Sequence, residues 1–262
     1  MNKKHFSLTL IAAALFLFAG AARPQSGSLD FVTIEEEMNL SRDVRTHSPL
    51  YFRLIRNRTI NQYFQTLSDS IGQFSDWETL DYKVYIMNRP DILHFSLPGG
   101  NIFISRGLIE LAETDCELAA VIAHEAVHCS HRHTVQQIGK KYAYALAAQK
   151  IVGENPEIVK TILESLFTDD TVLDYDKKNE FSADERAMHY MRQAGYDPDG
   201  LIKLLEKMDK LQDSREFLLR HLLRTHPQPT KRLKKLRDPY GALPPPSPAF
   251  HSMRIILDRI PE

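Results

Sequence analysis

The motif HEAVH, from His124 to His128, is the feature that most constrains this chain. An apolar, helix-favouring run lies just before it, and Thr114 and Glu117 have the spacing of a capping box. A helix should therefore begin near Asp115. Because residues four apart lie one above the other on a helix face, both imidazoles can reach a single metal ion.

Glu125 lies beside the two histidines without being a ligand. A carboxylate at this position can take a proton from a water that the metal activates, which is why H-E-x-x-H is a signature of zinc hydrolases. The alternative is a surface helix with two solvated histidines and a solvated glutamate. The apolar residues before His124 argue against that alternative, because they predict that the motif follows a buried run.

Composition narrows the class of protein. With 262 residues and 43% hydrophobic content, the chain can bury a real core in one domain. A formal net charge of −1 predicts no nucleic-acid partner. The two cysteines, Cys116 and Cys129, are separated on the predicted helix by roughly 20 Å, too far for a disulfide. We expect two buried thiols.

Residues 1–22 have the pattern of a secretory signal peptide. Two lysines precede an apolar run from Phe6 to Phe18, and small residues follow, with cleavage expected near Ala21 or Ala22. The run is shorter than the about 20 residues of a membrane span, although an uncleaved anchor stays open as the alternative. We therefore expect an exported protein.

Periodicity and turn residues divide the rest of the chain. Strands are predicted at residues 82–87, 92–97 and 101–105, with Gly99 and Gly100 turning the chain between the last two. A break is expected near Pro49. Helices are predicted at residues 33–45, 51–71, 106–112, from 115 onward, 135–152, 156–167, 178–193, 201–211 and 216–223. Residues 241–262 form a Pro-rich spacer and a tail that is undecided between strand and helix.

A second group of candidate residues lies on the predicted helix 178–193. Glu180 and Asp184 are four residues apart and share a face. A catalytic zinc held by two histidines needs a third protein ligand, and glutamate is a standard one. An acid four residues further on can accept the outer N–H of a ligand histidine. Two solvated acids are the alternative.

A third histidine ligand is less consistent with the spacing. Long-motif zinc peptidases carry Gly and His seven and ten residues after the first histidine, but this chain has His131 and Thr134 there. We expect His131 and His133 at the end of the helix, as polar surface residues or as partners of a ligand.

Several further motifs occur in order along the chain. They are Leu-Pro-Gly-Gly at 97–100, Gly-Leu at 107–108, Glu-x-x-Ala-Asp at 180–184, Ala-Gly-Tyr-Asp-Pro at 194–198, and Thr-His-Pro at 225–227 followed by Arg232. With HExxH they resemble the gluzincin zinc metallopeptidases of the Ste24-like family. That family includes the CaaX prenyl endopeptidases, HtpX, the mitochondrial Oma-type protease and the BepA-like periplasmic proteases. The resemblance runs from about residue 35 to residue 232.

The resemblance implies a fold and a metal site. The fold is a predominantly helical α+β gluzincin domain, from residue 23 to 240, with a small sheet beside the HExxH helix. One zinc ion per chain is implied, bound by His124, His128 and Glu180. Glu125 is implied as the general base, and Asp184 as the partner of a ligand histidine.

The resemblance also implies residues around the metal. His226 would lie near it, where it could donate to the developing oxyanion or occupy the open zinc position in a resting form. Arg232 would support the same loop. The strand before the glycine turn would receive an extended substrate, through Phe95, Leu97, Pro98 and Gly99. Where relatives commonly carry Asn-Ala, this chain has Leu93 and His94.

These features together predict a zinc-dependent metalloendopeptidase of the periplasm. Its expected substrates are misfolded or flexible envelope polypeptides, and its expected role is protein quality control. A zinc-binding chaperone or assembly factor with little proteolysis is one alternative, and a zinc hydrolase of a non-peptide amide is another. Association with the membrane periphery and the oligomeric state stay open.

Overall fold

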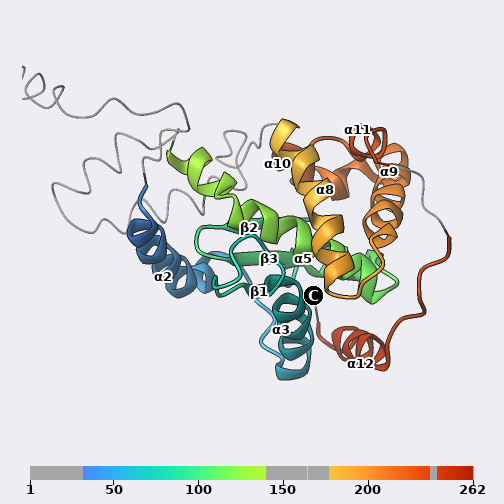
Figure 1. Cartoon of the computed structure of the whole chain (residues 1–262). Helices are drawn as coiled ribbons and strands as arrows, with labels where there is room; N and C mark the ends of the chain where they lie inside the picture. Colours follow the sequence, from blue (N-terminus) through green and yellow to red (C-terminus); the bar gives the residue numbers. More distant parts are fainter. Residues whose placement is uncertain (1–31, 140–163, 165–176, 237–240, 262) are drawn as a thin grey trace, which may run out of the picture. The chain divides into compact units, whose positions relative to one another are not determined.

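The structure is a computed structural model that describes residues 32–139, 164, 177–236 and 241–261. These residues form helices around a three-stranded sheet (Figure 1). The strands are β1 (Lys83–Met87), β2 (His94–Leu97) and β3 (Asn101–Ser105). The helices are α2 (Ile34–Tyr51), α3 (Arg58–Gly72), α4 (Arg106–Leu111), α5 (Asp115–Ser130), α8 (Lys177–Gln193), α9 (Asp199–Leu219), α10 (Leu222–Thr225), α11 (Pro229–Leu233) and α12 (Pro248–Leu257). The predicted class, mostly helical α+β with a small sheet, is confirmed.

The sheet has the order β1-β3-β2, with β3 parallel to β1 and antiparallel to β2. Gly99 and Gly100 turn the chain from β2 into β3 with φ values of 73° and 81°, in the region that side chains disfavour. A Cβ on Gly99 would lie 2.3 Å from the Cβ of Ser41. Glycine is therefore required both for the turn and for the close approach of α2. The strand β2 is left at one edge of the sheet.

The helix α5 is the central element of the packing. It begins with the predicted capping box, in which Thr114 and Glu117 bond each other's backbone N–H. Its apolar first half is fully buried, and the helix packs against α3, α8, α9, β2 and β3. The HExxH motif, at its other end, is therefore held inside the protein, as Figure 1 shows for the helix between the sheet and α8.

Helices α3 and α8 bury stripes with helical spacing. In α3 the stripe is apolar and begins after the cap residue Asn57, whose side chain accepts two backbone N–H bonds. In α8 the stripe alternates apolar residues with two acids, Glu180 and Asp184. Ala183 and Ala187 lie fully buried on this face, and their small size allows α8 to approach α5 closely.

Several predicted boundaries differ from the structure. The helix predicted at residues 51–71 begins only at Arg58, after the cap residue Asn57. Helix α2 continues through Pro49, because a proline in the last turn removes only one hydrogen bond; chain from residue 52 to 57 is then extended or irregular. Helix α9 runs unbroken to Leu219, since no Gly or Pro interrupts residues 212–215. The undecided tail is helical in α12. The predicted signal peptide and most of the predicted helices 135–152 and 156–167 lie outside the described residues.

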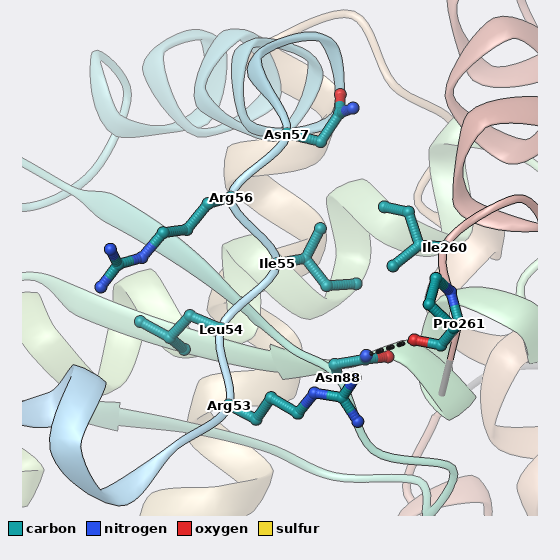
Figure 2. Close-up of a pocket in the computed structure, with 8 residues that line it drawn as sticks. All are labelled: Arg53, Leu54, Ile55, Arg56, Asn57, Asn88, Ile260 and Pro261. Atoms are coloured by element: carbon teal, nitrogen blue, oxygen red, sulfur yellow. Dashed lines mark hydrogen bonds between the residues drawn. The ribbon is translucent and has the colours of Figure 1, made fainter.

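The helix α12 packs back onto the domain. Phe250, Met253 and Leu257 are buried in the main hydrophobic cluster. After α12 the chain passes Asn88, whose Nδ2 donates to Pro261 O at 2.8 Å beside a cavity of about 350 Å³ (Figure 2). The C-terminal segment therefore contributes to the core.

Both cysteines are free and buried, as predicted. Among the described residues, no helix has the length and apolar character needed to cross a membrane.

Candidate metal centre

Helix α5 brings its two motif histidines together. The Nε2 atoms of His124 and His128 lie 3.0 Å apart, and both side chains are buried. This proximity follows from the i, i+4 spacing on a single helix face.

Helix α8 brings two acids to the same place. Glu180 Oε1 lies 3.1 Å from His128 Nε2, and Glu180 Oε2 lies 3.7 Å from His124 Nε2. Asp184, one turn further along, accepts a hydrogen bond from His124 Nδ1 at 2.9 Å. Both carboxylates are buried. The shared face of α8 that the sequence predicted therefore points at the HExxH helix.

Arg232, at the end of α11, fixes the second of these acids. Its Nε donates to Asp184 Oδ2 at 2.9 Å and its Nη2 donates to Asp184 Oδ1 at 2.5 Å. Burial would raise the pKa of Asp184, but the Arg232 guanidinium and the His124 contact lower it overall. A bidentate arginine thus holds the partner of His124 as an anion.

The residue His226, between α10 and α11, completes the cluster. Its Nδ1 lies 2.9 Å from each carboxylate oxygen of Glu180. Burial opposes its protonation, but the neighbouring Glu180 charge raises the pKa of His226 overall. Potential ligand atoms of His124, His128, Glu180 and His226 all lie within 4.8 Å of one another.

The outer nitrogen of His128 also has a partner. His133, just after α5, places its Nδ1 3.0 Å from His128 Nδ1. Burial and the neighbouring His128 lower the pKa of His133 to about 3. A neutral His133 can accept the N–H of His128, which leaves the His128 Nε2 lone pair facing Glu180.

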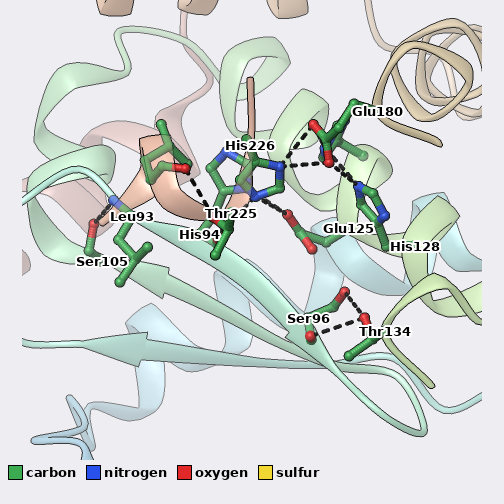
Figure 3. Close-up of polar contacts among 12 residues, drawn as sticks. Leu93, His94, Ser96, Ser105, Glu125, His128, Thr134, Glu180, Thr225 and His226 are labelled. Atoms are coloured by element: carbon green, nitrogen blue, oxygen red, sulfur yellow. Dashed lines mark hydrogen bonds and ion pairs between the residues drawn. The ribbon is translucent and has the colours of Figure 1, made fainter. Parts of the chain in front are cut away.

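The glutamate of the motif contacts a strand. Glu125 Oε1 lies 2.6 Å from Nδ1 of His94, which projects from β2 (Figure 3). Burial would raise the pKa of Glu125, but the His94 hydrogen bond lowers it overall. Burial and the nearby His226 lower the pKa of His94 to about 3. Glu125 Oε2 is buried and has no hydrogen-bond partner among the described residues.

The donor set fits a cation. Asp184 can only accept, so His124 Nδ1 carries the proton and its Nε2 presents a lone pair. That lone pair faces the Glu180 carboxylate, while burial and the nearby Arg232 lower the pKa of His124 and favour its neutral form. Electron-rich atoms this close repel one another unless a positive charge lies among them. Two imidazoles and a carboxylate are the ligand types that zinc takes in catalytic sites.

The free edge of β2 borders this cluster. Ser105 N donates to Leu93 O, so by alternation the backbone groups of His94 and Ser96 point away from β3. His94 O accepts from His226 Nε2 at 3.4 Å, and Ser96 O accepts from Thr134 Oγ1 at 3.3 Å. Both outward carbonyls of the edge are therefore taken by side chains.

The residues predicted to bind substrate lie in other surroundings. The side chains of Phe95 and Leu97 are buried on the opposite side of β2, in a cluster with Phe52 and Phe103. Pro98 O and the backbone of Gly99 bond within the turn and with α2. Their substrate role stays a prediction.

Several contacts in this cluster were not predicted as named pairs, among them those of Arg232 with Asp184 and of His226 with Glu180. Two more join a histidine to a residue of the HExxH motif. One joins His94 to Glu125, and the other joins His133 to His128. The signal for the first was present, because His94 stands where the resemblance leads one to expect alanine. For the second, His133 was already a candidate partner of a ligand.

The fold and this group of side chains define a zincin-type metallopeptidase: a buried HExxH helix, a glutamate from a following helix and a small sheet alongside. Residues 55–240 match the family model described as Peptidase family M48. The chain belongs to peptidase family M48, a family of metal-dependent proteases, and the resemblance predicted from the sequence is confirmed.

Three relatives illustrate the similarity. The mitochondrial metalloendopeptidase OMA1 of Arabidopsis thaliana is 33% identical over 164 residues, which cover 62% of this chain and 32% of that protein. The beta-barrel assembly-enhancing protease of Escherichia coli (strain K12) is 25% identical over 260 residues, covering 90% of this chain and 52% of that protein. Metalloprotease LoiP of the same strain is 27% identical over 180 residues, covering 68% of this chain and 69% of that protein. The chain thus spans about half or less of the first two relatives.

Proposed function

We propose that this protein is a zinc-dependent endopeptidase whose single zinc ion is bound by His124, His128 and Glu180. The observation that carries the proposal is the convergence of these three buried side chains from α5 and α8. Asp184 orients His124, and Arg232 holds Asp184 in its charged form. The polar contacts of this group make it a preorganised site rather than a set of solvated acids.

The proposed reaction is hydrolysis of a peptide bond. The chemistry that zinc supplies when bound in such a site is polarisation of the scissile carbonyl and activation of a water molecule. Glu125 is our candidate for the general base: its unpartnered, buried Oε2 accepts the proton of the attacking water, and the proton is then delivered to the leaving amine. His226 is our candidate donor to the oxygen that becomes negatively charged.

We propose that the substrate is an extended polypeptide that pairs with the free edge of β2. The outward backbone groups of His94 and Ser96, beside Glu125, support this proposal. Strand addition requires a main chain that is not already paired, which favours misfolded or flexible proteins over folded ones. Phe95, Leu97, Pro98 and Gly99 form the strand and turn that hold this edge.

We propose a role in quality control of envelope proteins. The signal-peptide pattern of residues 1–22 supports export to the periplasm. The name of the Escherichia coli and Yersinia pestis relatives, beta-barrel assembly-enhancing protease, supports a substrate among envelope proteins under assembly.

The test is cleavage of an unfolded protein, casein, by the zinc-loaded chain from Arg23 onward, beside Glu125→Gln. We expect the unchanged chain to cleave casein and the variant to be slower by roughly 10²- to 10⁴-fold, the usual contribution of a general base. Metal analysis should find one zinc in each. Equal rates would refute Glu125 as the base. If both hold zinc and neither cuts, a zinc-binding chaperone or assembly role replaces proteolysis.

A further inference from the structure

His94 projects from β2 toward the HExxH helix because of strand alternation. The side chains of Phe95 and Leu97 lie on the opposite face, in the apolar cluster with Phe103. His94 and Ser96 therefore share the face that α5 covers, and Ser96 contacts Thr134 there. A histidine at this position has little choice of direction.

The imidazole of His94 makes the one hydrogen bond that the structure shows for the Glu125 side chain within the described residues. Nδ1 of His94 is 2.6 Å from Oε1 of Glu125, and the two residues are 3% and 0% exposed. The ring also lies over that of His226, with centroids 4.6 Å apart and a tilt of 33°. Packing on one side and a hydrogen bond at Nδ1 together fix the orientation of the imidazole.

The two oxygens of Glu125 therefore have different surroundings. Oε1 accepts from His94, whereas Oε2 is buried without a partner among the described residues. A carboxylate on a flexible side chain rotates unless something holds it, and each misdirected rotamer removes the base from its water. A donor at Oε1 selects the rotamer in which Oε2 is left for the reaction.

We propose that His94 is a positioning residue for the base: it donates its Nδ1–H to Oε1 and thereby directs Oε2 of Glu125 toward the attacking water, whose proton Oε2 accepts. The inference rests on the proposed function, in which Glu125 is the base. It assigns His94 a part in the turnover step rather than in zinc binding or in folding.

The His94 variants that test this differ in one property each. His94→Asn keeps an N–H at the position of Nδ1, since the amide nitrogen and Nδ1 are both attached to Cγ. His94→Phe keeps a planar ring without a donor, and His94→Ala removes both. His189→Asn makes the same exchange at an exposed site of α8 and is the matched control.

Steady-state cleavage of casein-derived peptides gives the first readout. We expect kcat of His94→Ala and His94→Phe to fall by roughly 10- to 100-fold, the usual cost of removing such a supporting partner, with KM little changed. His94→Asn should recover most of the loss. In the Glu125→Gln background, His94→Ala should lower kcat no further, because His94 acts only through the Glu125 carboxylate.

The second readout needs neither zinc nor activity. A buried imidazole N–H bonded to a carboxylate gives a proton resonance far downfield of the amides. In the metal-free chain this resonance should vanish in His94→Phe and shift in Glu125→Gln, while His189→Asn leaves it unchanged. A resonance that is the same with and without the Glu125 carboxylate would overturn the contact.

The metal content of the variants distinguishes a positioning role for His94 from a role as a metal ligand. His94, Glu125 and His226 also lie close enough together to hold a cation, so His94 could be a ligand instead. Loss of a second zinc equivalent in His94→Ala would overturn the positioning role, as would unchanged kcat in His94→Phe. If the chain without substitutions cleaves nothing, the proposed function itself is refuted. The role of His94 in turnover is then refuted with it.

Discussion

Two groups of aspartate, arginine and histidine side chains in the described part of the chain can be compared, one inside the protein and one at its surface. The inner group is Asp184, Arg232 and His124, and its ion pair is 1% and 3% exposed. The outer group is Asp76, Arg186 and His131, and its ion pair is 32% and 40% exposed. Both groups link α8 to α5, the inner one through His124 within the helix and the outer one through its C-cap residue His131. The chemical groups are therefore the same, and their exposure to solvent differs.

The two groups differ in whether water can reach the ion pair. In both groups arginine donates two hydrogen bonds to the aspartate, and in both the pKa of the aspartate is lowered, by Arg186 and His131 for Asp76 and by Arg232 and His124 for Asp184. Water can replace the arginine of the outer group, whereas nothing can replace that of the inner group. The inner group therefore controls the orientation of a candidate metal ligand, whereas the outer group is a solvent-exposed ion pair that links two surface segments.

Removing the inner carboxylate should have the largest effect on stability. Asp184→Asn leaves the Arg232 charge buried without its counter-charge, so we expect the free energy of unfolding to fall by about 3–5 kcal/mol. Zinc affinity should fall by roughly 10- to 100-fold, because His124 loses its orienting partner. Urea unfolding and zinc titration measure the two effects. Glu185→Gln, exposed on the same helix, is the control, and an equal loss there would contradict the argument.

Removal of the metal should have the second largest effect on the free energy of unfolding. Zinc that binds the folded chain alone should stabilise it by about 2.7 kcal/mol when free zinc is 100 times its dissociation constant. A chelator should lower the Tm accordingly, and added zinc should restore it. The outer group should not matter: Asp76→Asn should show the same zinc-dependent shift in Tm as the unchanged chain. A shift that vanishes in Asp76→Asn would remove the distinction between the groups.

An Arg-to-Lys exchange should sharpen the comparison. Lysine keeps the charge but cannot form the two parallel hydrogen bonds. For Arg232→Lys we expect the free energy of unfolding to fall by about 1–3 kcal/mol, the cost of leaving a buried hydrogen-bond partner unsatisfied. At Arg186, water can complete the bonds, and the loss should stay below about 0.5 kcal/mol. Thermal unfolding of the two variants in parallel gives the answer, and similar losses would mean that burial is not the deciding variable.

The smallest expected effect is the pH response of the outer group. The pKa of Asp76 is lower in the folded chain than in the unfolded one, so its contribution is present above the ordinary carboxyl pKa of about 3.9 and is lost as the pH falls through the folded value. Asp76→Asn should cost at most about 1 kcal/mol near neutral pH. The cost should shrink as the medium is acidified below pH about 4. Acid titration of the unfolding free energy, beside Glu78→Gln, measures this; a cost that grows with acid would contradict the sign.

Features confined to one helix could be predicted from the sequence. The capping box, the start of α5 and the common face of His124 and His128 follow from spacing alone. The shared face of Glu180 and Asp184 follows in the same way. Such local rules hold here because no tertiary contact overrides the helix geometry.

Features that depend on distant segments could not be predicted in the same way. His94 and Glu125 are 31 residues apart, and their contact depends on how β2 packs over α5. The pairing of Asp184 with Arg232 spans 48 residues, and the family resemblance placed Arg232 beside the loop of His226 without naming Asp184 as its partner. Helix α2 continues through Pro49 because Ser48 and Phe52 close its last turn, which the proline rule alone does not indicate. Helix boundaries of this kind are decided by packing as much as by propensity.

The edge of β2 has one more consequence. Thr134 and His226 already bond to its two outward carbonyls, so a strand that added to this edge would meet acceptors that each have one partner. An incoming polypeptide must exchange partners one for one, which changes the number of hydrogen bonds little. If the proposed substrate pairs with this edge, its binding is a competition for these two carbonyls, which favours polypeptides that add side-chain contacts to the exchange.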